Sequence, residues 1–444
     1  MNSADPSLLA LGAVILLIAG VLLLRLPVAL LLALLGFGGY AVLDGVENAL
    51  LMLGNELWGA FSGYGLTVVP LFVLMGQICF HSGMSERLYR AVHALTGHRR
   101  GGIAAATLLA CGAFSAICGS NTATAATMTS VALPQMRRYG YHPVIATGSI
   151  AAGTTLGVII PPSVVAIVVG VQTSLSIQRL FISGIIPGML LLGGFLLVVL
   201  AVSLLRPAWM PAGNRASRAE KLQALPGLLE TLVLFLLVIC GMSFGVFTPT
   251  EAGAAGCALA LVLGFFRRGL DGRGIRAALG ESMGISAMIF LLMAGAAVFG
   301  KFLALTRLPF TLADAIAAWH VSGWLVLAVM GAVFLAGGMI MDSLALLVMT
   351  LPVFYPLAEK LGWDPLWFCM LLIVITSMGA ITPPVGVSSY VVSSMSGQVG
   401  SRDRVPLDKV FAGASMFLPA FMVTLLLMAS FPSLCLWLPS QLGL

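Results

Sequence analysis

The feature that most constrains this chain is a long apolar stretch that small polar residues, glycine and proline interrupt twice. The first interruption is Gly119-Ser120-Asn121-Thr122-Ala123-Thr124, and the second is Thr154-Thr155 followed by Gly157 and Pro161-Pro162. Such residues free backbone groups from helical hydrogen bonds, and the bilayer interior tolerates free groups only against protein or a water-filled cavity. The stretch therefore predicts two broken membrane elements that surround a polar site.

The same pattern returns in the second half of the chain, at an offset of half the length of its 444 residues. At this single ungapped offset the following glycines and prolines coincide: Pro134 with Pro356, Gly140 with Gly362, Pro143 with Pro365, Gly157 with Gly379, and Pro161-Pro162 with Pro383-Pro384. Thr154-Thr155 also aligns with Thr376-Ser377, and Ser120 with Asp342. Many secondary transporters build a midplane binding site from such paired broken segments. We interpret the offset as an internal duplication; the alternative is two unrelated proline-kinked helices.

The overall composition excludes most classes of soluble protein. With 60% hydrophobic and 9% charged residues, the chain has too little polar surface to cover a soluble globule. We predict an all-α polytopic membrane protein that lies in a lipid bilayer. The basic residues fall in short loops between apolar runs, so the net charge of +6 reports topology, and no nucleic-acid partner is expected.

Motifs of enzymes and cofactor sites are missing from the sequence. The seven cysteines form no CxxC pair and lie in apolar sequence, which indicates small buried residues rather than a disulfide or metal set. There is no HExxH or Walker motif. We expect neither enzyme activity nor a cofactor.

Basic clusters predict the orientation of the spans, because cytoplasmic loops are enriched in lysine and arginine. They fall at residues 87–100, 137–138, 206–221, 267–276 and 402–409, whereas the acidic loop at 44–56 contains no lysine or arginine. This places the N-terminus in the periplasm. About ten transmembrane helices and two re-entrant helical hairpins account for every basic cluster, although Lys301 and Arg307 then fall on the outer side.

The predicted hairpins lie near residues 102–135 and 324–357, and a broken helix follows each, near 144–171 and 366–392. The two hairpins open to opposite sides of the membrane, as an inverted-topology repeat requires. The expected parts are N-terminal scaffold helices (1–63), a first transport repeat (64–178), scaffold helices with a central basic loop (179–281), a second transport repeat (282–397) and a C-terminal helix (398–444). That last helix is expected as one span from Phe411 to Leu438.

The hairpin tips and broken helices offer hydroxyls, free carbonyls and helix N-termini at mid-membrane depth. Oxygen ligands of this kind suit a hard monovalent cation, and free N–H groups suit a carboxylate. The candidate ligands at the tips are Gly119, Ser120, Asn121, Thr122, Thr124, Gly338, Asp342 and Ser343. Those in the broken helices are Thr154, Thr155, Gly157, Pro161, Pro162, Gly379, Thr382, Pro383 and Gly386.

Asp342 is the one acid that the topology places deep in an apolar segment. A carboxylate there is costly without a partner, so it is a functional candidate by default. Two roles are open: direct contact with a cation, or an N-cap on the second helix of its hairpin. For Ser120, Asn121, Thr122 and Thr124 the alternative to a ligand role is helix capping with small-residue packing.

Several short motifs occur in one order along the chain. They are Gly119-Ser120 followed by Ala123-Thr124-Ala125-Ala126, residues 134–141 (PQMRRYGY), Gly157 with Ile160-Pro161-Pro162-Ser163, residues 247–252 (FTPTEA) and residues 381–386 (ITPPVG). Together they resemble the large membrane subunit of tripartite ATP-independent periplasmic (TRAP) transporters, the DctM-like or M subunit, from about Leu8 to Leu438. The sequence departs from that family at Asn121, where Ser is more frequent, and at Ser343, where Pro commonly follows the Asp.

The resemblance implies a sodium-coupled secondary transporter in the bacterial inner membrane. It would import organic anions, usually carboxylates such as C4-dicarboxylates or sugar acids, with Na+ as the coupling ion. A periplasmic substrate-binding protein would deliver the anion, and a small four-helix membrane subunit would be a separate polypeptide. In that family the hairpins and broken helices carry the sodium and substrate sites and are thought to move as an elevator against a fixed scaffold.

Other functions fit parts of the sequence. Ser120-Asn121-Thr122 is also similar to the tip motif of self-sufficient sodium/dicarboxylate symporters, but those carry a second such triplet where this chain has Asp342-Ser343-Leu344. A membrane-embedded enzyme would need a catalytic group that the sequence does not offer. A purely structural scaffold is the remaining alternative.

Overall fold

The computed structural model describes the chain except for residues 1–5, 25, 119, 319–321 and 399–403, so the candidate Gly119 lies outside the described residues. The described residues form helices and no strand. The first half contains α1 (Pro6–Leu24), α2 (Val28–Asp44), α3 (Val46–Ser62), η1 (Tyr64–Thr67), α4 (Val68–His81), α5 (Met84–Thr96), α6 (Gly102–Cys118), α7 (Asn121–Arg138), α8 (Pro143–Thr154), η2 (Thr155–Val158), α9 (Val164–Thr173), α10 (Ile177–Leu205) and η3 (Pro207–Trp209), where η marks a 3-10 helix. The second half contains α11 (Arg218–Ser243), α12 (Pro249–Phe266), α13 (Gly272–Thr306), α14 (Leu308–Ala318), α15 (Gly323–Ile340), α16 (Ser343–Lys360), α17 (Pro365–Gly379), α18 (Val387–Ser396), α19 (Leu407–Ser415), α20 (Leu418–Ser430) and α21 (Ser433–Gln441).

The bounds of the helices repeat at the same offset of half the chain length. Helix α7 has the same length as α16, and both of its ends coincide with those of α16 at that offset, while α6 and α15, α8 and α17, and α9 and α18 agree within a few residues. The packing repeats as well: α2 packs on α13 as α12 packs on α4, and α9 packs on α16 as α18 packs on α7. The duplication therefore extends from the sequence to the tertiary structure.

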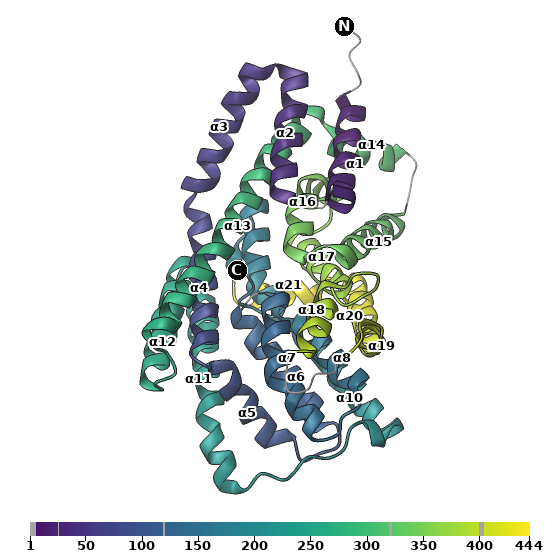
Figure 1. Cartoon of the computed structure of the whole chain (residues 1–444). Coiled ribbons are helices and arrows are strands. Elements are labelled where there is room, and N and C mark those ends of the chain that lie inside the picture. Colours follow the sequence, from purple (N-terminus) through teal and green to yellow (C-terminus); the bar gives the residue numbers. More distant parts are fainter. Residues whose placement is uncertain (1–5, 25, 119, 319–321, 399–403) are drawn as a thin grey trace.

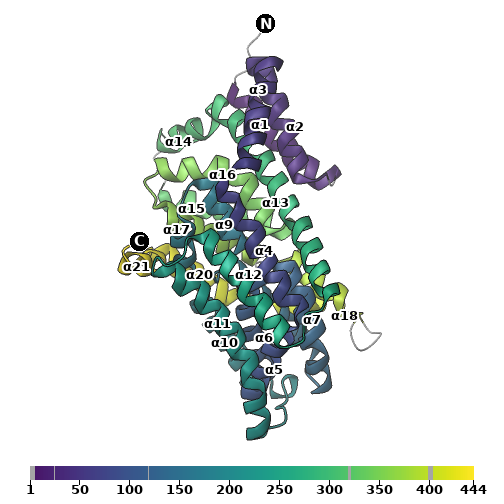
Figure 2. The same ribbon diagram turned by 90° about the vertical axis from the view of Figure 1, so that its left-hand side faces the viewer.

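The hairpins α6–α7 and α15–α16 lie toward opposite ends of the molecule, as Figures 1 and 2 both show. Each hairpin breaks where a polar side chain caps the second helix. Ser120 Oγ accepts a hydrogen bond from the Ala123 amide at 3.4 Å, and Asp342 Oδ2 accepts one from the Leu344 amide at 3.0 Å. A cap of this kind satisfies an amide that the helix leaves free, so the chain can end one helix and start another inside the protein.

Glycine brings each broken helix close to the first helix of its hairpin. A Cβ atom on Gly157 would lie 2.1 Å from Ser115 Cβ, and one on Gly379 would lie 2.6 Å from the carbonyl carbon of Gly338. Both distances are far below van der Waals contact, so only glycine fits these two crossings. The peptide bonds Pro161-Pro162 and Pro383-Pro384, at equivalent positions in the two breaks, are both cis.

Among the described residues, seven helices are long and apolar enough to cross a membrane, or eight if α19 and α20 count as one bent span. The halves of the broken helices are shorter than a span, which is one reason why length alone does not reproduce the ten spans expected from the sequence. The exact number of spans therefore stays a prediction.

The C-terminal part differs from the single span expected at Phe411–Leu438. The structure has three helices there, and α19 and α20 meet at a bend of 43°. Pro419 lies in the first turn of α20, and Pro432 directly precedes α21. Proline lacks the amide hydrogen that a continuing helix needs, and it is favoured in a first turn. The apolar run is therefore continuous in sequence but divided in structure.

Candidate substrate and cation site

The two hairpin tips line one cavity of about 430 Å³. The first tip contributes Ser120, Asn121 and Thr122, and the second contributes Asp342, Leu344 and Ala345. The remaining lining residues are Pro27, Val28 and Ala29 before and in α2, Val73 and Gln77 of α4, Val158, Val164 and Val165 of the first broken helix, and Ile285, Met288, Ile289 and Leu292 of α13. Equivalent segments from the two halves of the chain are thus brought to the same small volume.

Asn121 is the most distinctive polar group of the first tip. Its side chain is 3% exposed, and neither Oδ1 nor Nδ2 has a hydrogen-bond partner within the described part of the chain. The neighbouring hydroxyls of Ser120 and Thr122 lie 3.1 Å apart and bond each other. A buried amide without a partner is unfavourable by about 1–3 kcal/mol, which makes Asn121 available to a ligand.

The second tip presents a carboxylate. Asp342 caps α16 through Oδ2, and its side chain is exposed at the cavity. The capping role that the sequence left open is therefore present. The cap does not decide whether Asp342 also contacts a cation, because a carboxylate has two oxygens and can accept several bonds at once.

Gln77 is a further polar lining residue, which the sequence analysis did not single out. It lies on α4, is 6% exposed, and its Oε1 has no hydrogen-bond partner in the described ranges. The sequence does contain a signal that could have identified Gln77, a single amide within an otherwise apolar predicted span. Polar groups at that depth tend to be functional.

The predicted residues of the broken helices do not line this cavity. The hydroxyl groups of Thr154, Thr155 and Thr382 donate to carbonyls three or four residues earlier in the chain, at 2.8, 2.6 and 2.7 Å. Gly157, Gly338 and Gly379 lie at the close helix crossings described above. The residues of the candidate set that do not line the cavity are Thr124, Thr154, Thr155, Gly157, Pro161, Pro162, Gly338, Ser343, Gly379, Thr382, Pro383 and Gly386.

Several buried hydroxyls behind the tips also have no partner among the described residues. In the first half they belong to Ser115 and Thr124, and in the second half to Ser343 and Ser388. Thr124 and Ser343 were predicted from the sequence. Ser115 and Ser388 were not: Ser115 lies in the last turn of α6, just before the first tip, and Ser388 lies in the first turn of α18.

Among the described residues, the cavity lining offers an acidic side chain and no basic one. Asp342 is its only acid, and the described residues that line it include no lysine, arginine or histidine. Helices α7 and α16 begin at the tips, and a helix N-terminus carries a partial positive charge equivalent to about half an elementary charge. An organic anion that entered this cavity would still meet a carboxylate without a basic side chain to balance it.

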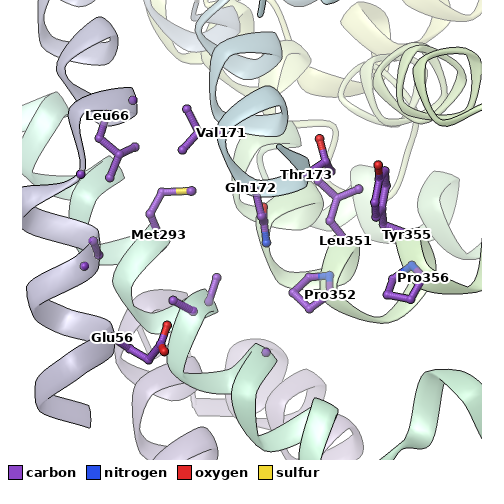
Figure 3. A pocket seen from close by; sticks show the side chains of 17 residues that line it. Glu56, Leu66, Val171, Gln172, Thr173, Met293, Leu351, Pro352, Tyr355 and Pro356 are labelled. Carbon is purple, nitrogen blue, oxygen red and sulfur yellow. The ribbon is translucent and has the colours of Figure 1, made fainter. Parts of the chain in front are cut away.

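A second cavity of about 430 Å³ separates two groups of helices. Figure 3 shows Leu66 and Met293, of η1 and α13, across from Gln172 and Pro352, of α9 and α16, with Glu56 at one end. Gln172 Nε2 donates to the Val348 carbonyl at 2.8 Å. On the side of α3 and α13, Glu56 pairs with Lys301 at 3.3 Å. Each of these polar contacts joins two residues on the same side of the cavity, so the cavity marks a boundary in the packing of the helices.

Comparison with known proteins decides the family. Residues 14–434 match the family model described as "Tripartite ATP-independent periplasmic transporter, DctM component". The chain belongs to the DctM family of TRAP transporters. It is 33% identical over 408 residues to a C4-dicarboxylate TRAP transporter large permease protein DctM of Pseudomonas aeruginosa, covering 92% of this chain and 93% of that protein. The family resemblance inferred from the sequence is thereby confirmed.

Other DctM relatives carry different names. A sialic acid TRAP transporter large permease protein SiaM of Vibrio cholerae is 32% identical over 386 residues, covering 87% of this chain and 88% of that protein. Among solved structures, the YdaH transporter of Alcanivorax borkumensis matches with a TM-score of 0.61 and 18% identity over 99% of both chains, a likeness of fold alone. This DctM-family chain is therefore a large permease subunit, a multi-pass protein of the inner membrane, and not an enzyme.

Proposed function

We propose that this chain is the permease of a sodium-coupled TRAP transporter that imports organic carboxylates. The observation that carries the proposal is the cavity shared by the two hairpin tips, where Asp342 meets Ser120 and Asn121. Broken elements that meet in this way form the ligand sites of many secondary transporters. The proposal assigns ion and substrate to this cavity and to the buried hydroxyls behind it.

Sodium coupling follows from the charge of the site. Carboxylate, amide and hydroxyl oxygens suit a hard cation, and Asn121, Gln77 and Asp342 offer such oxygens at the cavity. A bound cation would supply the positive charge that the lining side chains lack, so the anion would bind well only after the cation. Import driven by a sodium gradient would depend on this order.

The substrate class is proposed from the relatives. One is named for C4-dicarboxylates and another for sialic acid, and both ligands carry a carboxylate. The helix N-termini at the tips would receive that group. Cavity residues other than the tips, such as Gln77 and the valines of the first broken helix, would then distinguish one anion from another.

Two protein partners belong to the proposal: a periplasmic substrate-binding protein and a small four-helix membrane subunit. A relative named isethionate TRAP transporter permease protein DctMQ is matched over only 53% of its length, whereas the DctM of Pseudomonas aeruginosa is matched over 93%. For the present chain we propose a small subunit that is a separate polypeptide.

We further propose an N-terminus in the periplasm and an elevator movement. The repeats at 64–178 and 282–397 supply the hairpins and broken helices of the moving part, and α1–α3 and α10–α12 belong to the scaffold. The basic residues 87–100 and 206–221 lie at the end of the molecule that would face the cytoplasm.

The test is uptake of labelled succinate and sialic acid into proteoliposomes that contain the chain, its small subunit and its binding protein. Uptake should require an inward sodium gradient, should stop when choline replaces sodium, and should not respond to ATP. Equal uptake of either anion in choline would refute the sodium proposal. Full uptake by the chain alone would instead identify a self-sufficient symporter.

A further inference from the structure

A third cavity, which is polar, lies far from the hairpin tips, at the end of the molecule where α5 and the start of α11 meet. Its volume is about 770 Å³. Four arginines line it: Arg87 and Arg90 of α5, Arg215 of the central loop and Arg267 after α12. The acids that line it are Glu220 and Glu230. Basic side chains therefore outnumber acids in this cavity.

The two acids are already engaged within the protein. Glu230 is 5% exposed and pairs with Arg87 at 3.0 Å and with Arg267 at 2.6 Å. Glu220 accepts a hydrogen bond from the Ser217 amide at 2.6 Å in the capping box that starts α11. Its pKa is lowered by that bond, so it stays ionised and fixed in place.

Arg90 and Arg215 are the two guanidinium groups left over. Both are exposed, and in the described structure neither pairs with a carboxylate; Arg90 donates only to the Glu86 carbonyl, at 3.4 Å. Each therefore presents free N–H donors with a fixed fork geometry that matches phosphate oxygens. Two unpaired arginines that line one cavity indicate an anionic ligand.

His93 also lines this cavity and adds a buried donor or acceptor atom to it. Its Nε2 has no hydrogen-bond partner among the described residues, while its ring stacks on Tyr89 at 6.0 Å and lies 5.9 Å from Tyr139. Burial lowers the pKa of His93, so the ring is neutral and can offer one N–H without adding charge. A phosphate oxygen would satisfy that group.

The position of the cavity indicates where the ligand comes from. Helix α11 is long and apolar enough to cross the membrane, and the cavity lies against its first three turns. On the same turns Leu222, Leu225 and Leu229 are 69%, 39% and 47% exposed. Beyond the cavity, Leu232, Val233 and Leu236 of α11 are 45%, 50% and 44% exposed. Polar ligands and then apolar surface therefore follow each other along one helix, in the order in which a phospholipid presents its headgroup and acyl chains.

We propose that this cavity binds the phosphodiester headgroup of an anionic phospholipid, held by Arg90, Arg215 and His93. Basic pockets between helices at the cytoplasmic surface are suited to such headgroups. The bound lipid would join α5, α11 and the central loop. Only the assignment to the cytoplasmic leaflet rests on the proposed topology.

The test is a binding titration of the purified full chain with phosphatidylglycerol, phosphatidylcholine and sn-glycerol 3-phosphate, followed by native mass spectrometry. Phosphatidylglycerol should bind tightest. The double variant R90Q/R215Q should weaken its binding about 30-fold, since each arginine near an anionic surface contributes about fivefold. The matched double variant R99Q/R100Q removes two exposed arginines outside the cavity and should leave the affinity within about threefold.

Three outcomes would overturn the proposal. They are equal losses in the two double variants, equal affinity for phosphatidylcholine and phosphatidylglycerol, and glycerol 3-phosphate binding as tightly as the lipid. The last result would identify a soluble phosphate compound as the ligand. Arg90 and Arg215 are exposed and unpaired, so neither substitution removes a packed contact, and the elution profile of each variant checks that it is folded.

Discussion

Replacing Asn121 by leucine should raise stability and remove the response to sodium at the same time. The side chain is 3% exposed, and both of its polar atoms are without a protein partner among the described residues. Leucine has the same branching, is larger and has no polar atom; because Asn121 lines a cavity that has room for it, the change removes an unfavourable buried group. If the amide oxygen is a sodium ligand, the same change removes part of the ion site.

The size of both effects can be worked out from this environment. An unsatisfied buried polar group costs about 1–3 kcal/mol, and because Asn121 borders a cavity the lower value applies, about 1 kcal/mol gained without sodium. In the unchanged chain, sodium at 100 times its dissociation constant should stabilise the fold by about 2.7 kcal/mol. The Asn121→Leu variant should lose most of this stabilisation by sodium.

Thermal unfolding of the purified chain in matched sodium chloride and choline chloride measures both quantities. Asn48→Leu is the control, because Asn48 is exposed and its amide donates to the Asp44 carbonyl at 3.0 Å, far from the tips. It should leave the sodium response unchanged. A variant at Asn121 that is less stable in choline, or that still gains the full increment from sodium, would refute the reasoning.

Three further predictions concern the tips, the helix crossings and the topology. Asp342→Asn keeps the N-cap but removes a charge, so the sodium concentration for half-maximal uptake should rise about fivefold, whereas a residue that only caps would leave it unchanged. Gly157→Ala places a Cβ atom 2.1 Å from Ser115 Cβ and should lower stability by about 1–3 kcal/mol in thermal unfolding, while Gly193→Ala, with nothing within 4 Å, should not. On a cysteine-free background, an impermeant thiol reagent added to intact cells should label Asn48→Cys and not Arg215→Cys; the reverse pattern would contradict the periplasmic N-terminus.

The sequence was most informative where polar and breaking residues interrupt apolar runs. The hairpins expected at 102–135 and 324–357 are observed as helix pairs from 102 to 138 and from 323 to 360. The broken helices expected at 144–171 and 366–392 are observed between 143 and 173 and between 365 and 396. The observed bounds agree with the expected ones because glycine and proline break a helix at the positions where they occur. Each interruption also occurs in both halves of the chain, so the pattern could be recognised twice.

Features that depend on packing between distant helices could not be predicted. Gln77 becomes part of the site only because α4 lines the same cavity as both hairpin tips. The start of α13 at Gly272 was missed because Arg273 and Arg276 were counted as loop residues, although a helix can carry charges beyond the membrane. The roles of the predicted tip ligands stay predictions, since capping and ion binding use the same oxygen atoms.

The two proline pairs have the same sequence and the same backbone isomer but not the same surroundings. Pro161 and Pro162 are buried, with Ile159 and Ile160 packed under Gly184 and Gly188 of α10, whereas Pro383, Pro384 and Val385 are exposed. The chain therefore holds its two equivalent breaks in unequal surroundings, one covered by α10 and one exposed. In the transport movement proposed above, the two breaks would have to exchange these surroundings, because only one side of the site can be reached at a time.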